Sequence, residues 1–522
     1  MTSSTAPSPS GPAAAGGGPP PAFRPEAVTR FHYVGHHLDF RTPDRVRLVC
    51  HYALDDLPFT EQITFLRPEG TDAPWPAVEP DHPALHRAAH LLFLLAGISY
   101  YKAAAPPVVE VPEPGLTPAE RRLLEAFYLD GLGEYAFRND LDLTDLRIVA
   151  PHRAPASPAA AAPGSAPAPR LDRPLIPFGG GLDSIVTVEG IRPRVGDPAL
   201  FVVAREADRF AAIETALAVA DLPVVRAERR LDPKILRSRE LGYRNGHVPV
   251  TGVISAIAVT AALLDGRDAV VMSNEWSASS GNAERNGRVV NHQWSKSLTF
   301  EDLFRAALAE AIPTAGAEAS DAGGDGGDNG GGDAAAVVYY SWLRPFSELW
   351  VANRFLPLDR YHLSFRSCNR AFHIDPAHRL DHWCGHCDKC AFIDLILSPF
   401  LPRERLEAVF TAGPEPLAND GLITQFRALL GLSGDIKPFE CVGDVDECRV
   451  AIVLAADRPD RQDSALVQQL AAETRPLIPG AVSPFAEALL RPLSEHRIPA
   501  AHAPADLGPA PDVGPDPGSG PR

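Results

Sequence analysis

Short apolar runs alternate with longer helical segments between residues 173 and 310. The runs PLIPF, ALFVVA, LPVVRA and DAVVMS have the length of buried strands, whereas EADRFAAIETALAVA and TGVISAIAVTAALL have the length and apolar content of helices. This alternation predicts an α/β fold, a doubly wound parallel sheet with helices on both faces. Sheets of this kind bind ligands outside the carboxyl ends of their strands.

The residues on either side of this block predict two further units. Residues 25–149 contain the strand-like segments VRLVCHYAL and EQITFL, so we expect an N-terminal α+β domain there. A helix in it begins with Thr117 as N-cap, Pro118 in the first turn and Glu120 completing a capping box. Residues 401–490 are expected to form a mostly helical C-terminal region. A chain of 522 residues is long enough for two or three such units.

Stretches rich in proline and small residues separate these blocks. They predict a disordered tail at 1–24, a linker at 150–172, a disordered insertion at 314–336 and a second disordered tail at 491–522. The unit built on the parallel sheet then extends over residues 173–400 and includes the insertion.

The composition narrows the class of protein. The net charge of −17 opposes nonspecific attraction to nucleic acid or to an anionic membrane. The apolar runs stay shorter than the roughly 18 residues that a membrane-spanning helix needs. The initial segment MTSSTAPSPSGPAAAGGGPPP does not have the basic start and apolar block of a secretory signal. We therefore expect a cytoplasmic protein with no nucleic-acid partner and no membrane partner.

The segment FGGGLDS follows the first predicted strand of the parallel sheet. The glycines Gly179, Gly180 and Gly181 let backbone N–H groups approach a phosphate closely, and the helix that follows adds free N–H groups and the positive end of its dipole. Ser184 can donate to a phosphate oxygen. Asp183 would repel a phosphate unless Mg²⁺ bridges the two or the carboxylate fixes the loop by accepting backbone hydrogen bonds. A plain flexible turn is the alternative.

Four of the seven cysteines cluster in the segment SCNRAFHIDPAHRLDHWCGHCDKC: Cys368, Cys384, Cys387 and Cys390. The CxxCxxC spacing with an upstream cysteine suits a closed tetrahedral Zn²⁺ site, which we place in a zinc knuckle at 366–392. A [4Fe–4S] cluster uses similar spacing and is the alternative cofactor. His382 and His386 are alternative ligands, and four buried free cysteines are the alternative without a metal.

Three further segments carry unusual polar residues. RNGHVPVTGVIS leads into a predicted helix, and SNEWSASSGNAERNGRVVNHQWSKS follows the strand DAVVM. Trp276 and Trp294 distinguish the second segment from a plain solvated loop. KPFECVGDVDE places Cys441 before a tight glycine turn, where the alternative is a small buried residue. The polar residues that we single out as candidates are Arg244, Asn274, Glu275, Arg285, His292 and Lys296.

The GGGLDS segment resembles the SGGxDS pyrophosphate loop of the N-type ATP pyrophosphatases, the PP-loop superfamily. Gly179 stands where that family has Ser, so one hydroxyl donor is missing. The resemblance implies a HUP-like PP-loop domain that splits ATP between its α and β phosphates and transfers AMP to a substrate oxygen. The CGHCDKC segment with its upstream Cys is similar to the structural zinc knuckle of the nitrile-forming PP-loop enzymes. The implied ATP-binding residues are Gly179, Gly180, Gly181, Asp183 and Ser184.

Together, FGGGLDS, NHQWSKS, YYSWLRPFSELW, CGHCDKC and KPFECVGDVDE resemble the MurL family of ATP-dependent UDP-N-acetylmuramoyl-L-alanyl-L-glutamate epimerases, over residues 30–455. The resemblance implies an isomerase in the cytosolic synthesis of peptidoglycan precursors, and hence a role in cell wall biogenesis, cell shape and division. The terminal L-glutamate of UDP-MurNAc-L-Ala-L-Glu would be inverted to D-glutamate, with ATP consumed to AMP and diphosphate and Mg²⁺ as a cofactor. A functional pairing with a UDP-MurNAc-L-alanine–L-glutamate ligase is also implied.

The implied reaction has a chemical rationale. Removing the α-proton of a glutamate carboxylate would put a second negative charge on the carboxylate, and conversion to an acyl-adenylate avoids that charge. A base can then take the proton, and the carbanion can be reprotonated on the other face. The candidates for proton transfer are Cys441, His292 and Lys296, with Asp183 at the junction of metal and phosphates. Arg244, Asn274, Glu275 and Arg285 are the candidates for substrate binding, and Arg285 or Lys296 could hold phosphates or carboxylates.

Other functions fit the same loop. An amide ligase or a nitrile synthase would trap the adenylate with an amine or ammonia. Lysidine formation or tRNA thiolation would need a basic surface with interleaved aromatic residues, which this acidic chain lacks. A nucleotide sensor without enzymatic activity would bind ATP and not turn it over.

Overall fold

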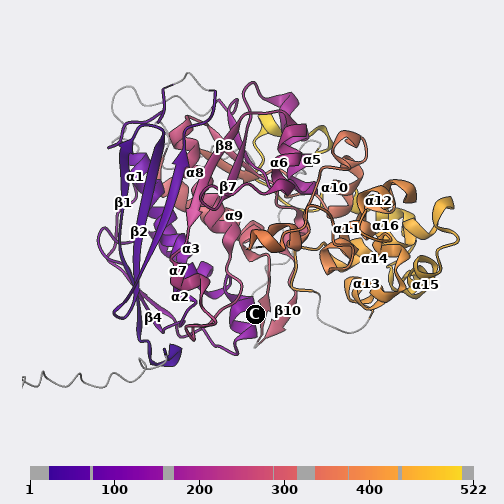
Figure 1. Cartoon of the computed structure of the whole chain (residues 1–522), viewed down its shortest axis with the longest axis horizontal. Coiled ribbons are helices and arrows are strands. Elements are labelled where there is room, and N and C mark those ends of the chain that lie inside the picture. The colour runs from indigo at the N-terminus through magenta and orange to yellow at the C-terminus, as the bar shows by residue number, and fades with distance from the viewer. Residues whose placement is uncertain are drawn as a thin grey trace, which may run out of the picture.

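The computed structural model describes residues 23–70, 74–156, 170–285, 287–313, 336–373, 375–432 and 438–507. Its centre is a ten-stranded sheet in the order β12-β9-β6-β7-β8-β3-β2-β1-β4-β5 (Figure 1). The sheet strands are β1 (Arg30–Thr42), β2 (Arg45–Leu54), β3 (Leu57–Leu66), β4 (Val108–Glu110), β5 (Arg147–Val149), β6 (Pro174–Pro177), β7 (Ala199–Ala204), β8 (Val224–Arg230), β9 (Ala269–Met272) and β12 (Val338–Ser341). A separate antiparallel hairpin pairs β10 (Ala283–Arg285) with β11 (Arg288–Val290).

Every neighbouring pair of strands from β12 to β8 is parallel. Within this half of the sheet, the chain winds outward from β6 to β7 and β8, then returns to β9 and β12 on the other side. The winding direction therefore reverses between β6 and β9, which is the switch point where open α/β sheets bind ligands. The predicted α/β class and the largely parallel sheet are confirmed.

The N-terminal strands extend the same sheet. β3 pairs antiparallel with β8, and β1, β2 and β3 form an antiparallel meander at the left of Figure 1. β2 alternates strictly between buried and half-buried residues, because one face lies on the core. The blocks 25–149 and 173–400, expected as separate domains, thus share one sheet.

The helices pack on both faces of the sheet and in a C-terminal group beside it (Figure 1). They are α1 (Pro83–Ala96), α2 (Ile98–Tyr101), α3 (Pro118–Leu129), α4 (Gly133–Arg138), α5 (Leu182–Ile191), α6 (Ala211–Ala220), α7 (Pro233–Leu236), α8 (Val250–Asp265), α9 (Leu298–Ala311), α10 (Glu348–Phe355), α11 (Asp388–Leu397), α12 (Arg403–Val409), α13 (Ile423–Leu429), α14 (Val445–Ala456), α15 (Ala465–Thr474) and α16 (Val482–Leu489). α3 has the predicted capping box: the Glu120 N–H donates to the Thr117 hydroxyl at 3.2 Å, and the Thr117 N–H donates to the Glu120 carboxylate at 2.9 Å.

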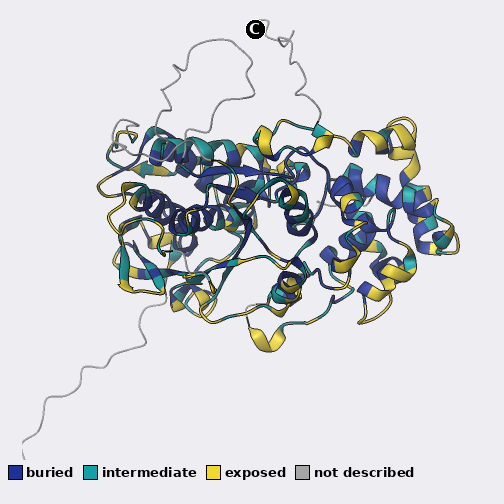
Figure 2. Cartoon of the chain, turned by 90° about the horizontal axis from the view of Figure 1, so that it is seen from above, coloured by how far each residue is buried: buried dark blue, intermediate teal, exposed yellow. Residues whose placement is uncertain are grey.

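Two hydrophobic cores lie on opposite faces of the sheet. On β6, Leu175 packs into a core with α1, α3, α8 and α9, and the next residue, Ile176, packs into a core with α5, α6 and α10. Successive side chains of a strand point to opposite faces, so a short apolar strand such as β6 serves both cores. The second core continues into the C-terminal helices α11 to α16, and Figure 2 shows the buried residues along the inner sides of these elements.

Two predicted spacer segments lie only partly within the described residues. The chain before the linker stays packed through Ala156, whose N–H donates to the Glu310 carbonyl oxygen at 2.8 Å, although we predicted the linker from residue 150. The insertion predicted at 314–336 lies outside the described residues except for Ala336. The Ala336 N–H donates to the Ile312 carbonyl oxygen at 2.7 Å, so the two described ends of this segment adjoin.

The predicted terminal tails are also described only in part. Most of residues 1–24 lies outside the described residues. Residues 491–507, which we predicted as part of a disordered tail, pack on the folded body: the Leu493 N–H donates to Pro345 at 2.7 Å, and the His502 ring is fully buried against Tyr340. Their apolar and aromatic contacts outweigh the local proline content. None of the described helices combines the length and hydropathy needed to cross a membrane.

Candidate active site

The glycine loop joins the carboxyl end of β6 to the first turn of α5, at the switch point of the sheet. Gly180 has a φ of +71°, and a β-carbon there would lie 3.0 Å from the Ala212 carbonyl oxygen, so only glycine fits. A β-carbon at Gly179 would meet no described atom within 4 Å, so this glycine borders free space. The loop therefore combines a constrained turn with an accessible backbone in front of a helix N-terminus, which suits a phosphate group.

Three carboxyl groups converge beside this loop. Asp183 in the first turn of α5, Glu275 after β9 and Glu348 at the start of α10 have carboxylate oxygens within 4.8 Å of one another. Burial and the neighbouring Glu275 carboxylate raise the pKa of Asp183 to about 6, and burial with the Asp183 charge raises the pKa of Glu348 well above its ordinary value. Three ionised carboxylates this close together repel one another, and a cation between them would offset that repulsion. The oxygen donors of this cluster therefore fit Mg²⁺.

Several buried polar atoms around the loop have no hydrogen-bond partner among the described residues. Buried polar groups are normally satisfied, so a cluster of unsatisfied ones marks a place for a ligand, an ion or water. Ser367 also lies against the loop, because a β-carbon at Gly181 would approach its β-carbon to 3.4 Å. The unpartnered atoms are Ser273 Oγ, Glu275 Oε2, Ser277 Oγ, Glu348 Oε2 and Ser367 Oγ.

A second group of side chains surrounds the Cys441 sulfur. The Lys296 ammonium donates to this sulfur at 3.3 Å, and the His292 ring also interacts with it. Burial alone would raise the pKa of Cys441, but the positive charges of Lys296, His292 and Lys389 outweigh it and lower the pKa to about 7. The thiolate is therefore a major form near neutral pH.

Glu134 of α4 completes this group from the N-terminal block. Its Oε2 accepts a hydrogen bond from His292 Nδ1 at 2.5 Å, and its Oε1 accepts one from Arg138 at 2.6 Å. Burial would lower the pKa of His292, but its interactions with Cys441 and Glu134 raise it to about 9. The His247 ring lies tilted against the His292 ring with centroids 4.2 Å apart, and burial followed by the His292 charge lowers the pKa of His247 to about 4. Both Glu134 oxygens accept hydrogen bonds, and we refer to Glu134, His292 and Cys441 together as the relay.

Lys296 connects the two groups. Its ammonium donates to Cys441 and also interacts electrostatically with Glu275 and Asp183, and together these anions raise its pKa against the effect of burial. Lys389 likewise acts on both Asp183 and Cys441. The glycine loop, the carboxyl cluster and the Cys441 group therefore form one continuous site.

The four predicted zinc ligands come together. Cys368, Cys384, Cys387 and Cys390 have sulfur atoms within 4.8 Å of one another, and Cys390 lies 3.5 Å from both Cys384 and Cys387. Four thiolates about 2.3 Å from one zinc ion lie about 3.8 Å apart in a tetrahedron, so this donor set fits Zn²⁺.

The residues next to this cysteine cluster reach the active site. On the Cys368 side, the Arg366 N–H donates to the Gly180 carbonyl oxygen at 2.8 Å. On the Cys390 side, the Lys389 ammonium donates to the Cys441 carbonyl oxygen. The cluster is thereby connected to both the glycine loop and the Cys441 loop.

Two family models cover most of the chain, MurL N-terminal domain over residues 22–318 and MurL C-terminal domain over residues 364–482. The chain belongs to the MurL family. Asp183, Glu275, His292 and Lys296 fall within the first MurL domain, and Cys441 falls within the second, so the site forms between them.

Curated MurL relatives are similar over most of their length. A Micromonospora protein named UDP-N-acetyl-alpha-D-muramoyl-L-alanyl-L-glutamate epimerase is 40% identical over 419 residues, covering 79% of this chain and 83% of the relative. A protein of the same name from Xanthomonas oryzae pv. oryzae is 37% identical over 482 residues, covering 92% and 97%. A third, from Salinispora tropica, is 38% identical over 419 residues, covering 79% and 81%. Epimerases are isomerases, so this chain is a member of an isomerase family.

Some predicted residues of this MurL-family chain are engaged in contacts within the protein. The Arg244 guanidinium donates to the Ala104 carbonyl oxygen at 2.7 Å, and that of Arg285 pairs with Asp140 at 2.5 Å, so both bind the N-terminal block. The backbone of Asn274 is held by the Ser341 hydroxyl, with its N–H donating at 2.6 Å. Their predicted contacts with substrate stay predictions. The Ser184 hydroxyl donates to Gly181 O at 2.9 Å, inside its own helix.

The structure adds three site residues that we did not predict from the MurL-like segments: Glu134, Glu348 and Lys389. Glu348 had a usable signal, because it is an acid inside the aromatic segment FSELW. Glu134 and Lys389 had none, since a charged residue near a helix end is normally solvated.

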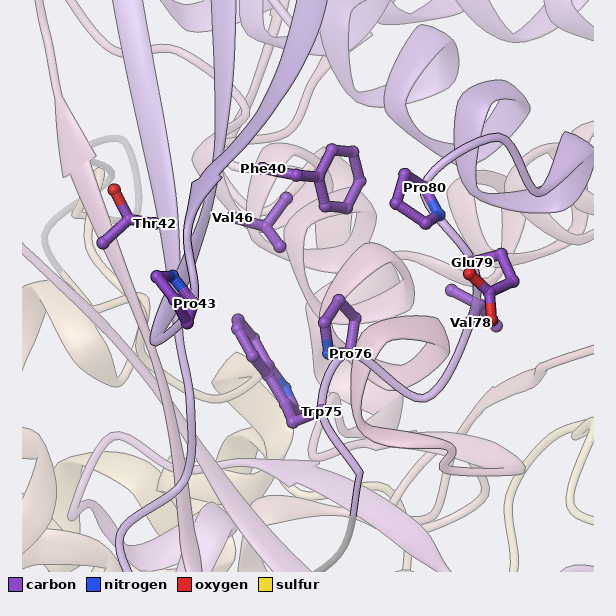
Figure 3. Close-up of a pocket in the computed structure, with 9 residues that line it drawn as sticks. All are labelled: Phe40, Thr42, Pro43, Val46, Trp75, Pro76, Val78, Glu79 and Pro80. Carbon is purple, nitrogen blue, oxygen red and sulfur yellow. The ribbon is translucent and has the colours of Figure 1, made fainter.

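A pocket of this MurL-family protein lies away from these groups, between the turn that joins β1 to β2 and the segment before α1 (Figure 3). Its lining is mostly apolar, and Glu79 is its one ionisable residue. It therefore lacks the pair of ionisable groups that proton removal and return would need. The lining residues are Phe40, Thr42, Pro43, Val46, Trp75, Pro76, Val78, Glu79 and Pro80.

Proposed function

We propose that the chain inverts the terminal L-glutamate of UDP-MurNAc-L-Ala-L-Glu to D-glutamate through an acyl-adenylate, with release of AMP and diphosphate. The observation that carries this proposal is the continuity of two kinds of chemistry in one site. Lys296 lies between a glycine loop with buried carboxyl groups and a Cys441–His292 pair. The first suits activation of a carboxylate by ATP, and the second suits movement of a proton.

The names of the relatives support the substrate and the outcome. Three family members that match most of this chain are named as epimerases of this UDP-linked dipeptide. Inversion at the α-carbon requires removal of a weakly acidic proton, and activation of the adjacent carboxylate lowers the cost of that step. The substrate nitrogen is part of a peptide bond, so an imine with pyridoxal phosphate cannot form there.

The activation half of the site would bind the co-substrate ATP. Backbone N–H groups of Gly179 to Gly181 and the N-terminus of α5 would receive its phosphates, and Ser184 would contribute only after its hydroxyl turns away from Gly181. Asp183, Glu275 and Glu348 would hold Mg²⁺, which when bound neutralises charge on the departing diphosphate. Lys296 then offsets charge that develops near the acyl group.

The inversion half would use Cys441, His292 and Lys296. A thiolate or neutral amine removes the α-proton, and a protonated neighbour delivers one to the other face. The four-cysteine cluster would hold Zn²⁺ in a structural role, because four protein ligands leave no open coordination position. A [4Fe–4S] cluster is the alternative occupant. We further propose that the reaction takes place in the cytoplasm, after a ligase has joined L-glutamate to UDP-MurNAc-L-alanine.

Chiral analysis with solvent isotope tests this proposal. The protein is incubated in D₂O with ATP, Mg²⁺ and UDP-MurNAc-L-Ala-L-Glu. Glutamate is then released from the product by hydrolysis and analysed for configuration and for deuterium at Cα. D-glutamate carrying deuterium is expected only when ATP is present. The α,β-methylene analogue of ATP should support neither inversion nor deuterium incorporation, because AMP cannot be transferred from it. Inversion that proceeds equally without ATP would contradict the adenylate route.

A further inference from the structure

Cys441, His292 and Glu134 come together from three distant segments. Glu134 lies on α4, His292 follows the β10–β11 hairpin and Cys441 precedes α14. The Glu134 carboxylate fixes Nδ1 of His292 at 2.5 Å, and the ring interacts with the Cys441 thiol. A carboxylate that orients an imidazole, which in turn activates a thiol, is the arrangement of nucleophilic catalysis.

The surroundings of the sulfur favour its ionised form. The Lys296 ammonium lies 3.3 Å from Sγ, and Lys389 binds the carbonyl oxygen of the same residue. Two cations and a carboxylate-oriented imidazole therefore hold the sulfur as a thiolate before the reaction begins. The thiolate is the form of cysteine that attacks an activated acyl group.

We propose that Cys441 is a nucleophile that takes the glutamyl group from the adenylate as a thioester, and that inversion occurs on this thioester. The inference rests on the proposed function. The Cys441 sulfur forms a bond to the acyl carbon, the bond from that carbon to the phosphate oxygen breaks, and AMP leaves with the electron pair. Later, water adds to the acyl carbon and loses a proton to a neighbouring base, and the carbon–sulfur bond breaks to return the thiolate.

A thioester explains how the activated acid survives until the proton has moved. An acyl-adenylate is prone to hydrolysis, whereas a thioester keeps the substrate attached after AMP has left. Its α-proton is also more acidic than that of a carboxylate, because the acyl group carries no negative charge. His292 and Lys296 both contact the sulfur, so both lie close to an acyl group bonded to it and are the proton carriers.

Acid quenching tests the thioester directly. The wild-type enzyme is mixed with ATP, Mg²⁺ and UDP-MurNAc-L-Ala-L-Glu, quenched in acid and measured by intact-protein mass spectrometry. We expect a mass increase equal to the substrate minus water, located on the Cys441 peptide and removed by neutral hydroxylamine. The control Cys50→Ala, in the buried face of β2 far from the site, should give the same adduct.

Exchange of labelled diphosphate into ATP measures adenylate formation separately from thioester formation. Cys441→Ala should retain exchange within about threefold, form no adduct and lose inversion by about 10³-fold or more. Wild-type protein that exchanges and inverts without any acid-stable adduct would overturn the thioester and leave the adenylate in place. The same follows if Cys441→Ala inverts its substrate at the wild-type rate. A wild-type enzyme without exchange would overturn the adenylate and the thioester together.

Discussion

The Lys296 ammonium donates a hydrogen bond to the Cys441 sulfur at 3.3 Å, across 145 positions of the chain. Lys296 ends a short 3₁₀ turn after the β10–β11 hairpin, and Cys441 lies in the loop before α14. The contact joins a residue of the first MurL domain to a residue of the second, within the candidate active site. Each of these residues therefore depends on the other for its protonation state.

Replacing Lys296 with Met should raise the pKa of Cys441. The pKa is lowered to about 7 by positive neighbours, so loss of the Lys296 charge moves it back toward the ordinary value, by about one unit or more. Alkylation requires the thiolate and increases as pH rises through the pKa. The pH midpoint of iodoacetamide labelling of the Cys441 peptide should therefore increase. The control Lys234→Met replaces a partly exposed lysine of α7 and should leave this midpoint unchanged. An unshifted midpoint in Lys296→Met would contradict the pairing.

Glu134→Gln should change the pH dependence of inversion more than it changes stability. The carboxylate helps to raise the pKa of His292 to about 9, so the neutral amide lowers that pKa and shifts the alkaline limb of the activity profile to lower pH. The imidazolium also lowers the pKa of Cys441, so the acidic limb should move to higher pH and the profile should narrow. Glu125→Gln, at a half-exposed position of α3, is the matched control. A profile that keeps its width would exclude Glu134 from the relay.

Gly179 and Gly180 should respond differently to alanine. Gly180→Ala places a β-carbon 3.0 Å from a carbonyl oxygen at a φ of +71°, so we expect a loss of about 1–2 kcal/mol in the free energy of unfolding. Gly179→Ala introduces a β-carbon into free space, so thermal stability should hold while ATP affinity falls. Differential scanning calorimetry and ATP titration measure the two effects. Unchanged ATP affinity in Gly179→Ala would argue against a phosphate at this loop.

Asp183→Asn should abolish exchange of diphosphate into ATP while the fold is retained. The amide binds Mg²⁺ more weakly than a carboxylate, so we expect a decrease of about 100-fold or more. The substitution also removes one of three crowded acids, so stability should not fall. Asp197→Asn, at a half-exposed ion pair with Arg173, is the control. Exchange at the wild-type rate in Asp183→Asn would place the diphosphate site elsewhere.

The cysteine cluster should bind about one zinc ion per chain. Structural zinc supplies on the order of 10 kcal/mol of folding free energy in small domains, so chelation should unfold the 366–392 region. Hydrogen exchange should then increase at Arg366 and Lys389, which connect the cluster to Gly180 and Cys441. Elemental analysis identifies the metal. Iron together with acid-labile sulfide would show that an iron–sulfur cluster occupies the site in place of zinc.

Much of the fold follows from local sequence. The apolar runs of β6, β7, β8 and β9 are strands because their apolar side chains reach one or other of the two cores, and the Thr117 capping box begins α3 as predicted. β1 was not predicted, because three histidines and an aspartate interrupt its apolar positions. No local pattern shows that β3 pairs with β8, since strand pairing depends on tertiary packing.

The candidate site was predictable where one segment carries a motif. The glycine loop, the cysteine cluster and the residues His292, Lys296 and Cys441 each lie in a distinctive stretch, and the structure brings the last three into contact. Glu134 could not be found in this way. Its carboxylate becomes significant only through burial beside a histidine that is distant in sequence.

The hydrogen bond between Ala336 and Ile312 has a practical consequence for engineering. The two described ends lie next to each other, between α9 and β12, so an insertion between them should leave the spacing of α9 and β12 unchanged. A fluorescent reporter could be fused at this position without displacing Lys296 from Cys441. Two separately expressed fragments ending and beginning there would carry His292 and Cys441 respectively, and signal from such a pair would report their reassembly.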